Sequence, residues 1–216
     1  MNVWLSARIL RVPRAFDSTH VFINCPFDAG YQPIFNAILF AVHDLGFIAR
    51  CARETDDSGE GRLSKIERII EECKFGIHDI SEVRLDTVNH LPRFNMPLEL
   101  GLFFGYKRFG GKSQTQKVSL VLDIEQYRYQ KFISDIAGHD IRSHGGEPGQ
   151  AIVAVRNWLT TASKRTQVPG GAAVGARYDR FCKDLPRLCM EAELDSGALT
   201  FRDLSNVIAG WLISNR

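Results

Sequence analysis

Residues 20–27 read HVFINCPF, and this stretch decides the fold. A short apolar run that stops at Pro26 is the pattern of a buried β-strand. A helical stretch follows directly, and its apolar residues recur at helical spacing. Pro33 opens this helix and Gly46 closes it, which is the usual punctuation at the two ends of a helix. The sequence therefore predicts a strand followed at once by a helix.

The same alternation continues along the chain. Further strands are expected at 47–52, 75–80 and 117–123, with helices at 63–73, 97–106 and 150–162. Strands that alternate with helices over short links predict a parallel sheet covered on both faces. Right-handed crossovers then favour the strand order 2-1-3-4, with room for a fifth strand. We predict a flavodoxin-like, three-layer α/β fold with a central parallel sheet.

The 216 residues divide into three expected parts. The α/β domain spans 18–163. Residues 164–176 (KRTQVPGGAAVGA) are basic and then rich in Pro, Gly and Ala, which favours a linker over a phosphate loop because no strand precedes its glycines. Residues 177–216 form a small helical extension with helices at 177–193 and 201–214. The second helix has one apolar face, which needs a partner in the main domain, a second subunit or another protein.

Composition narrows the class of protein. The chain has 27 basic and 25 acidic residues and a net charge of +2, which does not mark a dedicated nucleic-acid binder. No apolar run approaches the length of a transmembrane helix, and residues 1–15 do not have the pattern of a signal peptide. Five cysteines without a C-x-x-C pair suit reduced thiols. We expect a cytoplasmic protein with no membrane or nucleic-acid partner.

The topology predicts where a ligand would bind. In an open parallel sheet, ligands bind at the carboxyl ends of the strands, beside the point where strand order reverses. For the expected order this point lies between the first and third strands. It brings together residues 24–28, residues 79–81, the helix that starts near Pro97 and the polar loop 53–62 (RETDDSGEGR).

Two carboxylates at this edge could carry chemistry. Glu99 has Met96, Leu102 and Phe103 as helical neighbours, so burial is expected to raise its pKa, and it could act as a nucleophile or as an acid or base. The alternative is a glutamate that merely stabilises the first turn of its helix. Asp79 follows a buried strand and could also be catalytic, or could be a turn aspartate.

Further polar and aromatic residues surround these carboxylates. The loop with Asp57, Ser58 and Arg62 could cradle a phosphate or a ribose, or could be simply solvated. Phe27 could stack on a base or pack in the core. The predicted substrate-binding residues are Asn24, Pro26, Phe27, Asp57, Ser58, Arg62, Ser81 and Asn95. His139, Asp140 and His144 lack the spacing of a metal site, so we predict no metal.

Three segments carry a resemblance to known families. HVFINCPF resembles the opening strand and loop of TIR-like domains and of nucleoside 2-deoxyribosyltransferase-like proteins. The helix that ends in IIEEC (69–73) and the strand 75–80 resemble the stretch before their third strand. NMPLELG (95–101) resembles their Glu-Leu-Gly helix, which carries the catalytic glutamate. The resemblance covers roughly residues 20–125 and implies a TIR-like fold.

The resemblance also implies an activity. Active members of both families cleave an N-glycosidic bond, so Glu99 would be the nucleophile or would stabilise an oxocarbenium ion, and Asp79 would donate a proton or bind ribose. The substrate would be NAD, a nucleotide or a nucleoside, with no separate cofactor. The TIR Ser-x-x-Cys is RFNM (93–96) here, and the Asp-x-Gly of the transferases is missing, which leaves the substrate open. A role in bacterial antiphage defence is also implied. The alternatives are a nucleotide sensor without catalysis and a scaffold that acts through its helical extension.

Overall fold

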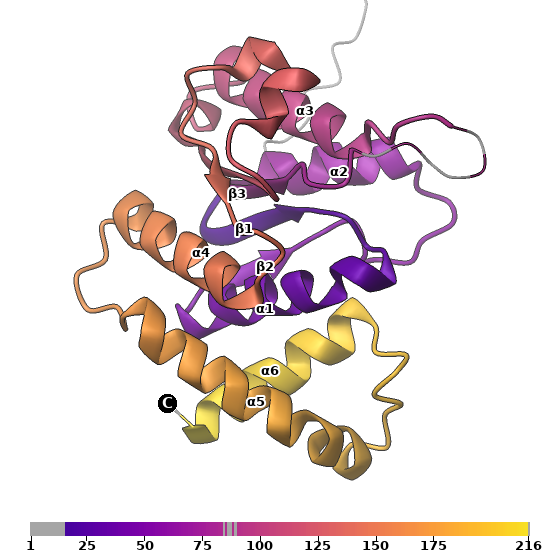
Figure 1. Ribbon diagram of the computed structural model, residues 1–216, viewed down its shortest axis with the longest axis vertical. Coiled ribbons are helices and arrows are strands. Elements are labelled where there is room, and N and C mark those ends of the chain that lie inside the picture. The colour runs from indigo at the N-terminus through magenta and orange to yellow at the C-terminus, as the bar shows by residue number, and fades with distance from the viewer. Residues whose placement is uncertain (1–15, 84, 86–87, 89, 216) are drawn as a thin grey trace, which may run out of the picture.

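The computed structural model describes residues 16–83, 85, 88 and 90–215, and its centre is a five-stranded parallel sheet (Figure 1). Every neighbouring pair of strands is parallel. The strands are β1 (Asp17–Asn24), β2 (Ile48–Arg50), β3 (Cys73–Asp79), β4 (Val118–Asp123) and β5 (Arg142–Ser143). Their order is β2-β1-β3-β4-β5, which confirms the predicted flavodoxin-like order and its fifth strand.

The two central strands are buried because their side chains meet helices on both faces of the sheet. Val21 and Ile23 of β1 point into one apolar cluster, while Phe22 between them points into another. This period of two with no polar residue in the run is typical of a parallel strand covered on both sides. The register pairs Val21 with Phe75 and Ile23 with Ile77, so β1 and β3 end together.

Helices form the two outer layers. One face of the sheet carries α1 (Gln32–Asp44) and α4 (Pro148–Ser163), and the other carries α2 (Arg62–Glu72) and α3 (Asn95–Phe109) (Figure 1). The expected helix at 97–106 is longer than predicted, and the expected strand at 47–52 is shorter. Within the described residues, no helix combines the length and the apolar character needed to cross a bilayer.

The helical extension consists of α5 (Gly171–Glu191) and α6 (Phe201–Asn215), which pack on the outer side of α1 and α4 (Figure 1). The linker predicted at 164–176 is longer than the one observed, because α5 already begins at Gly171. Val174 in the first turn of α5 is fully buried in the core. Trp211 on the apolar face of α6 contacts the ring of Phe40 in α1, with 5.9 Å between centroids. The face that needed a partner therefore finds it within the chain. That the extension also binds a second copy or another protein stays a prediction.

A buried ion pair fixes the extension to the sheet domain. The guanidinium of Arg177 in α5 donates hydrogen bonds of 3.0 and 2.6 Å to the two carboxylate oxygens of Asp44, which has no exposed side-chain surface. Because hydrogen bonds to a charged group are worth about 1.5–3 kcal/mol, Arg177→Ala is expected to lower the free energy of unfolding by about 2 kcal/mol. Urea denaturation measures this. Arg187→Ala on the same helix is the control, since Arg187 is 54% exposed, and it should leave the midpoint unchanged. Equal midpoints for all three proteins would contradict the anchoring role.

Candidate functional site

Glu99 lies at the wall of a small pocket between α2 and α3. Its side chain is only 8% exposed. The pocket has a volume of about 220 Å³ and is formed by the first residues of both helices, which are Arg62, Leu63, Ile66, Asn95, Leu98 and Glu99. Three of the predicted site residues, Arg62, Asn95 and Glu99, therefore come together here. The apolar wall of Leu63, Ile66 and Leu98 was not predicted to belong to the site, although Leu63 and Ile66 lie on the apolar stripe of the expected helix 63–73.

The environment of Glu99 places its titration near neutral pH. Burial raises the pKa of the carboxyl to about 7, and the positive charge of Arg62 opposes this shift. Nη2 of Arg62 lies 3.8 Å from Oε1 of Glu99, which is a long ion-pair distance. At neutral pH both the acid and the carboxylate are populated. A carboxyl group shifted in this way at a pocket wall is typical of catalytic sites.

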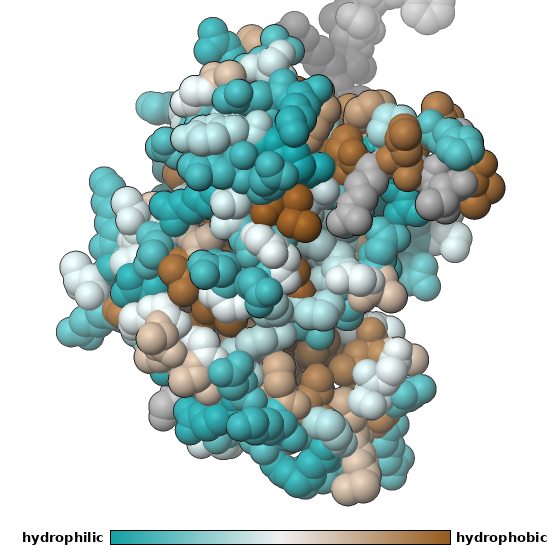
Figure 2. Space-filling view, in the orientation of Figure 1, coloured by the Kyte–Doolittle hydropathy of each residue, from teal (hydrophilic) through white to brown (hydrophobic). Residues whose placement is uncertain are grey.

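The segment that leads from β3 into α3 exposes apolar side chains, and one of them, Leu98, also lines the pocket. Leu85, Leu91, Phe94 and Leu98 between β3 and the first turns of α3 are each at least 55% exposed. Figure 2 shows apolar side chains gathered over this part of the surface. Such a surface beside a polar group suits a ligand with one flat apolar part and one charged part.

Asn24 holds α3 in place above the sheet. Its Nδ2 donates to the carbonyl oxygen of Met96 at 2.9 Å and lies 3.1 Å from Nδ1 of His78. Burial lowers the pKa of His78 to about 3, so the ring is neutral and Nδ1 accepts the bond. Asn24 was predicted to bind substrate, but its side chain is buried and turned inward. It is a positioning residue for the helix that carries Glu99.

Asp79 lies in the interior and does not contribute to the walls of the Glu99 pocket. The hydroxyl of Tyr31 donates to Oδ2 at 2.7 Å, and the backbone N–H of Ser81 donates to Oδ1 at 2.8 Å. Nε2 of His144 lies 2.9 Å from Oδ2, within ion-pair distance but outside good hydrogen-bond geometry. A carboxylate enclosed by donors and without exposure is not placed to give a proton to a substrate. Its geometry matches the alternative of a turn aspartate.

The histidines near the fifth strand have structural contacts. Nδ1 of His144 accepts from the N–H of Gly146 at 3.0 Å, which leaves Nε2, on the side of Asp79, as the ring nitrogen that carries a proton. His139 stacks on the ring of Phe104, with 5.2 Å between centroids. In the described part of the chain no three His, Cys, Asp or Glu side chains are grouped as metal ligands.

The remaining predicted residues lie outside the pocket. Pro26 and Ser81 are buried. Asp57 and Ser58 are exposed in the loop between β2 and α2, before Arg62. Phe27 is half-buried: the guanidinium of Arg53 lies 4.3 Å from its ring centroid, and Phe35 meets the ring edge-on at 5.5 Å. Its ring therefore packs against side chains of this protein, where the sequence had left stacking on a base as the alternative.

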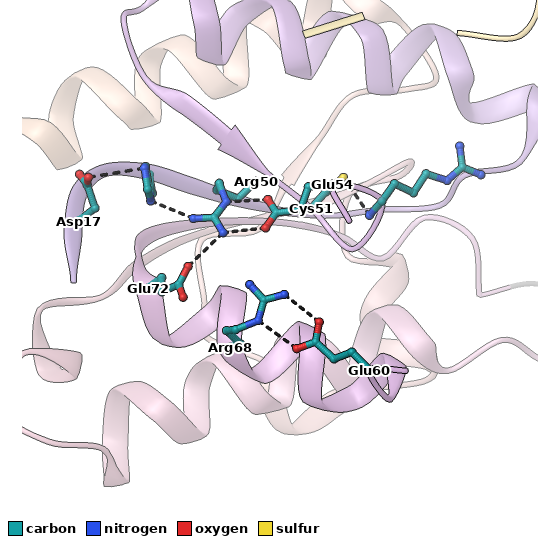
Figure 3. A network of polar contacts seen from close by, with 9 residues as sticks. Asp17, Arg50, Cys51, Glu54, Glu60, Arg68 and Glu72 are labelled. Atoms are coloured by element: carbon teal, nitrogen blue, oxygen red, sulfur yellow. Dashed lines mark hydrogen bonds and ion pairs between the residues drawn. The ribbon is translucent and has the colours of Figure 1, made fainter. Parts of the chain in front are cut away.

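The loop between β2 and α2 is tied down at both ends, as Figure 3 shows. At the start of the loop, Arg50 donates two hydrogen bonds of 2.6 Å to the carboxylate of Glu54, and a third bond to Glu72. At its end, Arg68 donates bonds of 3.0 and 2.9 Å to the carboxylate of Glu60. The loop is therefore ordered by ion pairs, and the position of Arg62 directly after it is fixed.

No family model matches this chain, and no curated protein or solved structure matches it either. A carboxylate at the wall of a mostly apolar pocket stabilises a positive charge that develops on a bound ligand, because little water screens the attraction. Proton transfer and nucleophilic attack are the other reactions open to such a group.

Proposed function

We propose that this protein is an N-glycosidase that cleaves the base–ribose bond of NAD or of another nucleotide or nucleoside. The observation that carries the proposal is the buried carboxyl of Glu99, with a pKa of about 7, at the wall of a pocket of about 220 Å³. Breaking a glycosidic bond leaves positive charge on the ribosyl carbon. An anionic carboxylate held beside that carbon lowers the barrier.

The reaction would proceed in two steps. In the first step the bond between C1′ and the base nitrogen breaks, and its electron pair leaves with the base. The ionised carboxylate of Glu99 stabilises the ribosyl cation or forms an ester with C1′. In the second step a water oxygen bonds to C1′ and one of the water protons goes to solvent. Where an ester has formed, its bond between C1′ and the Glu99 oxygen breaks in this step, and the electron pair returns to the carboxylate. The apolar side chains of Leu63 and Leu98 would lie against the flat base and exclude other water.

The pocket also bears on the leaving group. Among its lining residues, all of which the structure describes, Glu99 is the one carboxyl group. With Asp79 enclosed elsewhere, the described residues that line this pocket include no second acid to protonate the leaving base. A pyridinium base needs none, because the electron pair of the broken bond neutralises its positive charge. This consideration favours NAD over a neutral nucleoside as substrate.

A release assay tests the proposal. Purified protein is incubated with NAD and with a panel of nucleosides and nucleotides, and freed base is measured by chromatography. Release by the parent and not by Glu99→Ala is the expected result. Binding of NAD without any release would favour the alternative of a nucleotide sensor.

The activity should depend on pH in a defined direction. Because the ionised form of Glu99 is the active one, kcat/KM is expected to rise with pH and to level off above about pH 7. The charge of Arg62 lowers the pKa of Glu99, so Arg62→Gln should move the inflection to higher pH, while Arg187→Ala should leave it in place. A rate that falls as pH rises through 7 would instead make Glu99 a general acid.

The proposal has two further parts, which are the location of the protein and its biological role. A cytoplasmic location suits five cysteines that are all free thiols in the structure. A role in antiphage defence rests on the family resemblance alone.

A further inference from the structure

A second, larger pocket adjoins the one at Glu99. It has a volume of about 660 Å³ and shares Arg62 with the smaller pocket. Its walls come from three distant parts of the chain, namely residues 52–56 after β2, the start of α2 and residues 200–202 at the start of α6. In Figure 1 the first turn of α6 lies at the same end of the molecule as the loops that follow β1 and β2. The size is typical of pockets for small organic ligands.

The pocket is predominantly basic. Four of its lining residues are Arg53, Arg62, Lys65 and Arg202, and two are the acids Glu54 and Asp56. The carboxylate of Glu54 is already engaged by two 2.6 Å hydrogen bonds from Arg50, which is not among the lining residues. The charge that faces a ligand is therefore positive.

Two of the arginines are available to bind an anion. Among the described residues, the carboxylate within ion-pair distance of Arg62 is that of Glu99, at 3.8 Å. The side chain of Arg202 is exposed and makes no hydrogen bond or ion pair with any other described residue. The ammonium of Lys65 donates to the carbonyl oxygen of Thr55 at 2.6 Å and keeps two further protons to donate. Planar guanidinium groups that lack tight partners are suited to bidentate binding of phosphate.

We propose that this second pocket is a phosphate subsite, and that α6 of the helical extension supplies part of it through Arg202. This inference rests on the proposed function, because the proposed function places the ribose of the substrate beside Glu99. In a 5′-nucleotide the phosphate is attached to the ribose whose anomeric carbon carries the base. Two adjacent pockets that share Arg62 can therefore hold one nucleotide, with the anomeric carbon beside Glu99 and the phosphate in the second pocket. The preferred substrates are then phosphorylated ones, such as NAD or a nucleoside 5′-phosphate, and not bare nucleosides.

The first test measures binding without turnover. Ribose 5-phosphate, inorganic phosphate and ribose are titrated calorimetrically into the full-length protein and its variants. Ribose 5-phosphate is expected to bind more tightly than inorganic phosphate, and ribose not to bind. Arg202→Ala should weaken binding of ribose 5-phosphate at least 10-fold, and Arg202→Lys less. Arg187→Ala, which removes another exposed arginine of the extension, should have no effect. Equal binding by the parent and Arg202→Ala would overturn the inference.

The second test separates this inference from the proposed activity. Release of base is compared for AMP against adenosine, and for nicotinamide mononucleotide against its riboside, so that each pair differs only in the 5′-phosphate. A parent preference for the phosphorylated member that disappears in Arg202→Ala supports the subsite. Equal release from both members overturns the subsite and leaves the glycosidase intact. Binding of ribose 5-phosphate through Arg202, without any release of base, supports the subsite and contradicts the glycosidase.

Discussion

Glu99→Gln is expected to slow base release about 1,000-fold while leaving binding of the substrate within a few-fold of the parent. Glutamine keeps the size of the side chain but carries no negative charge, so it neither stabilises the ribosyl cation nor bonds to C1′. Loss of one preorganised electrostatic group in an active site typically slows turnover by about 10²–10³-fold. Steady-state kinetics together with calorimetric titration separate turnover from binding.

A matched control for this variant is Asp57→Asn, which removes a carboxylate from the exposed part of the neighbouring loop, outside both pockets. It should retain full activity. If Glu99→Gln turned over at the parental rate, Glu99 would not be the reacting group, whatever the activity of the chain. If Asp57→Asn were equally impaired, the effect would belong to the loop and not to the pocket.

Glu99→Gln should also be more stable than the parent at alkaline pH. The pKa of Glu99 rises from an ordinary value of 4.5 to about 7 in the folded chain, so between these values the folded state holds a proton that the unfolded chain has lost. Stability therefore falls as pH rises through this window, by up to about 3 kcal/mol. Glutamine has no such titration. Urea denaturation at pH 5 and pH 8 should show the variant gaining on the parent at the higher pH, and a constant difference would contradict the assigned burial.

The sequence was sufficient for the sheet because its pattern is local. The alternation of apolar runs and helical stripes predicts the strand order, and the neighbours of Glu99 within its own helix predict its burial. Contacts between distant segments leave no such local trace. Lys117 is buried with its ammonium donating to the carbonyl oxygens of Ile70 and Cys73, and nothing in its flanking residues indicates this. Capping of a helix end by a remote lysine depends on tertiary packing.

The same reason explains why the rim of the sheet was predicted only in part. Topology correctly brought Asn24, Asp79 and the start of α3 to one edge, but it does not determine which side chains face outward. Asn24 turns inward, and its Nδ2 donates to the carbonyl oxygen of Met96 in the first turn of α3, which packs over the strand end. Arg202 was not predicted as a site residue, because its place beside the loop after β2 depends on how α6 packs against α1, which no local pattern determines.

Asp79→Ala is expected to lower the free energy of unfolding by about 3–5 kcal/mol, because the buried carboxylate accepts two hydrogen bonds and each is worth about 1.5–3 kcal/mol. The substitution takes the acceptor from the hydroxyl of Tyr31 and the N–H of Ser81, and the contact partner from His144. Burial and the charge of Asp79 raise the pKa of Tyr31 well above its usual range, so its hydroxyl stays protonated and needs an acceptor. Urea denaturation of the parent and the variant measures the loss.

Activity per folded molecule distinguishes this structural role from the catalytic one implied by the family resemblance. Tyr31→Phe removes one donor of the cluster and leaves the carboxylate in place, so it should fold and lose only about 1–2 kcal/mol. If Asp79 acts through the fold, Asp79→Asn and Tyr31→Phe keep their turnover within a few-fold of the parent, measured well below their unfolding midpoints. Turnover at least 100-fold slower in Asp79→Asn, with Tyr31→Phe unaffected, would show that the carboxyl reaches the substrate.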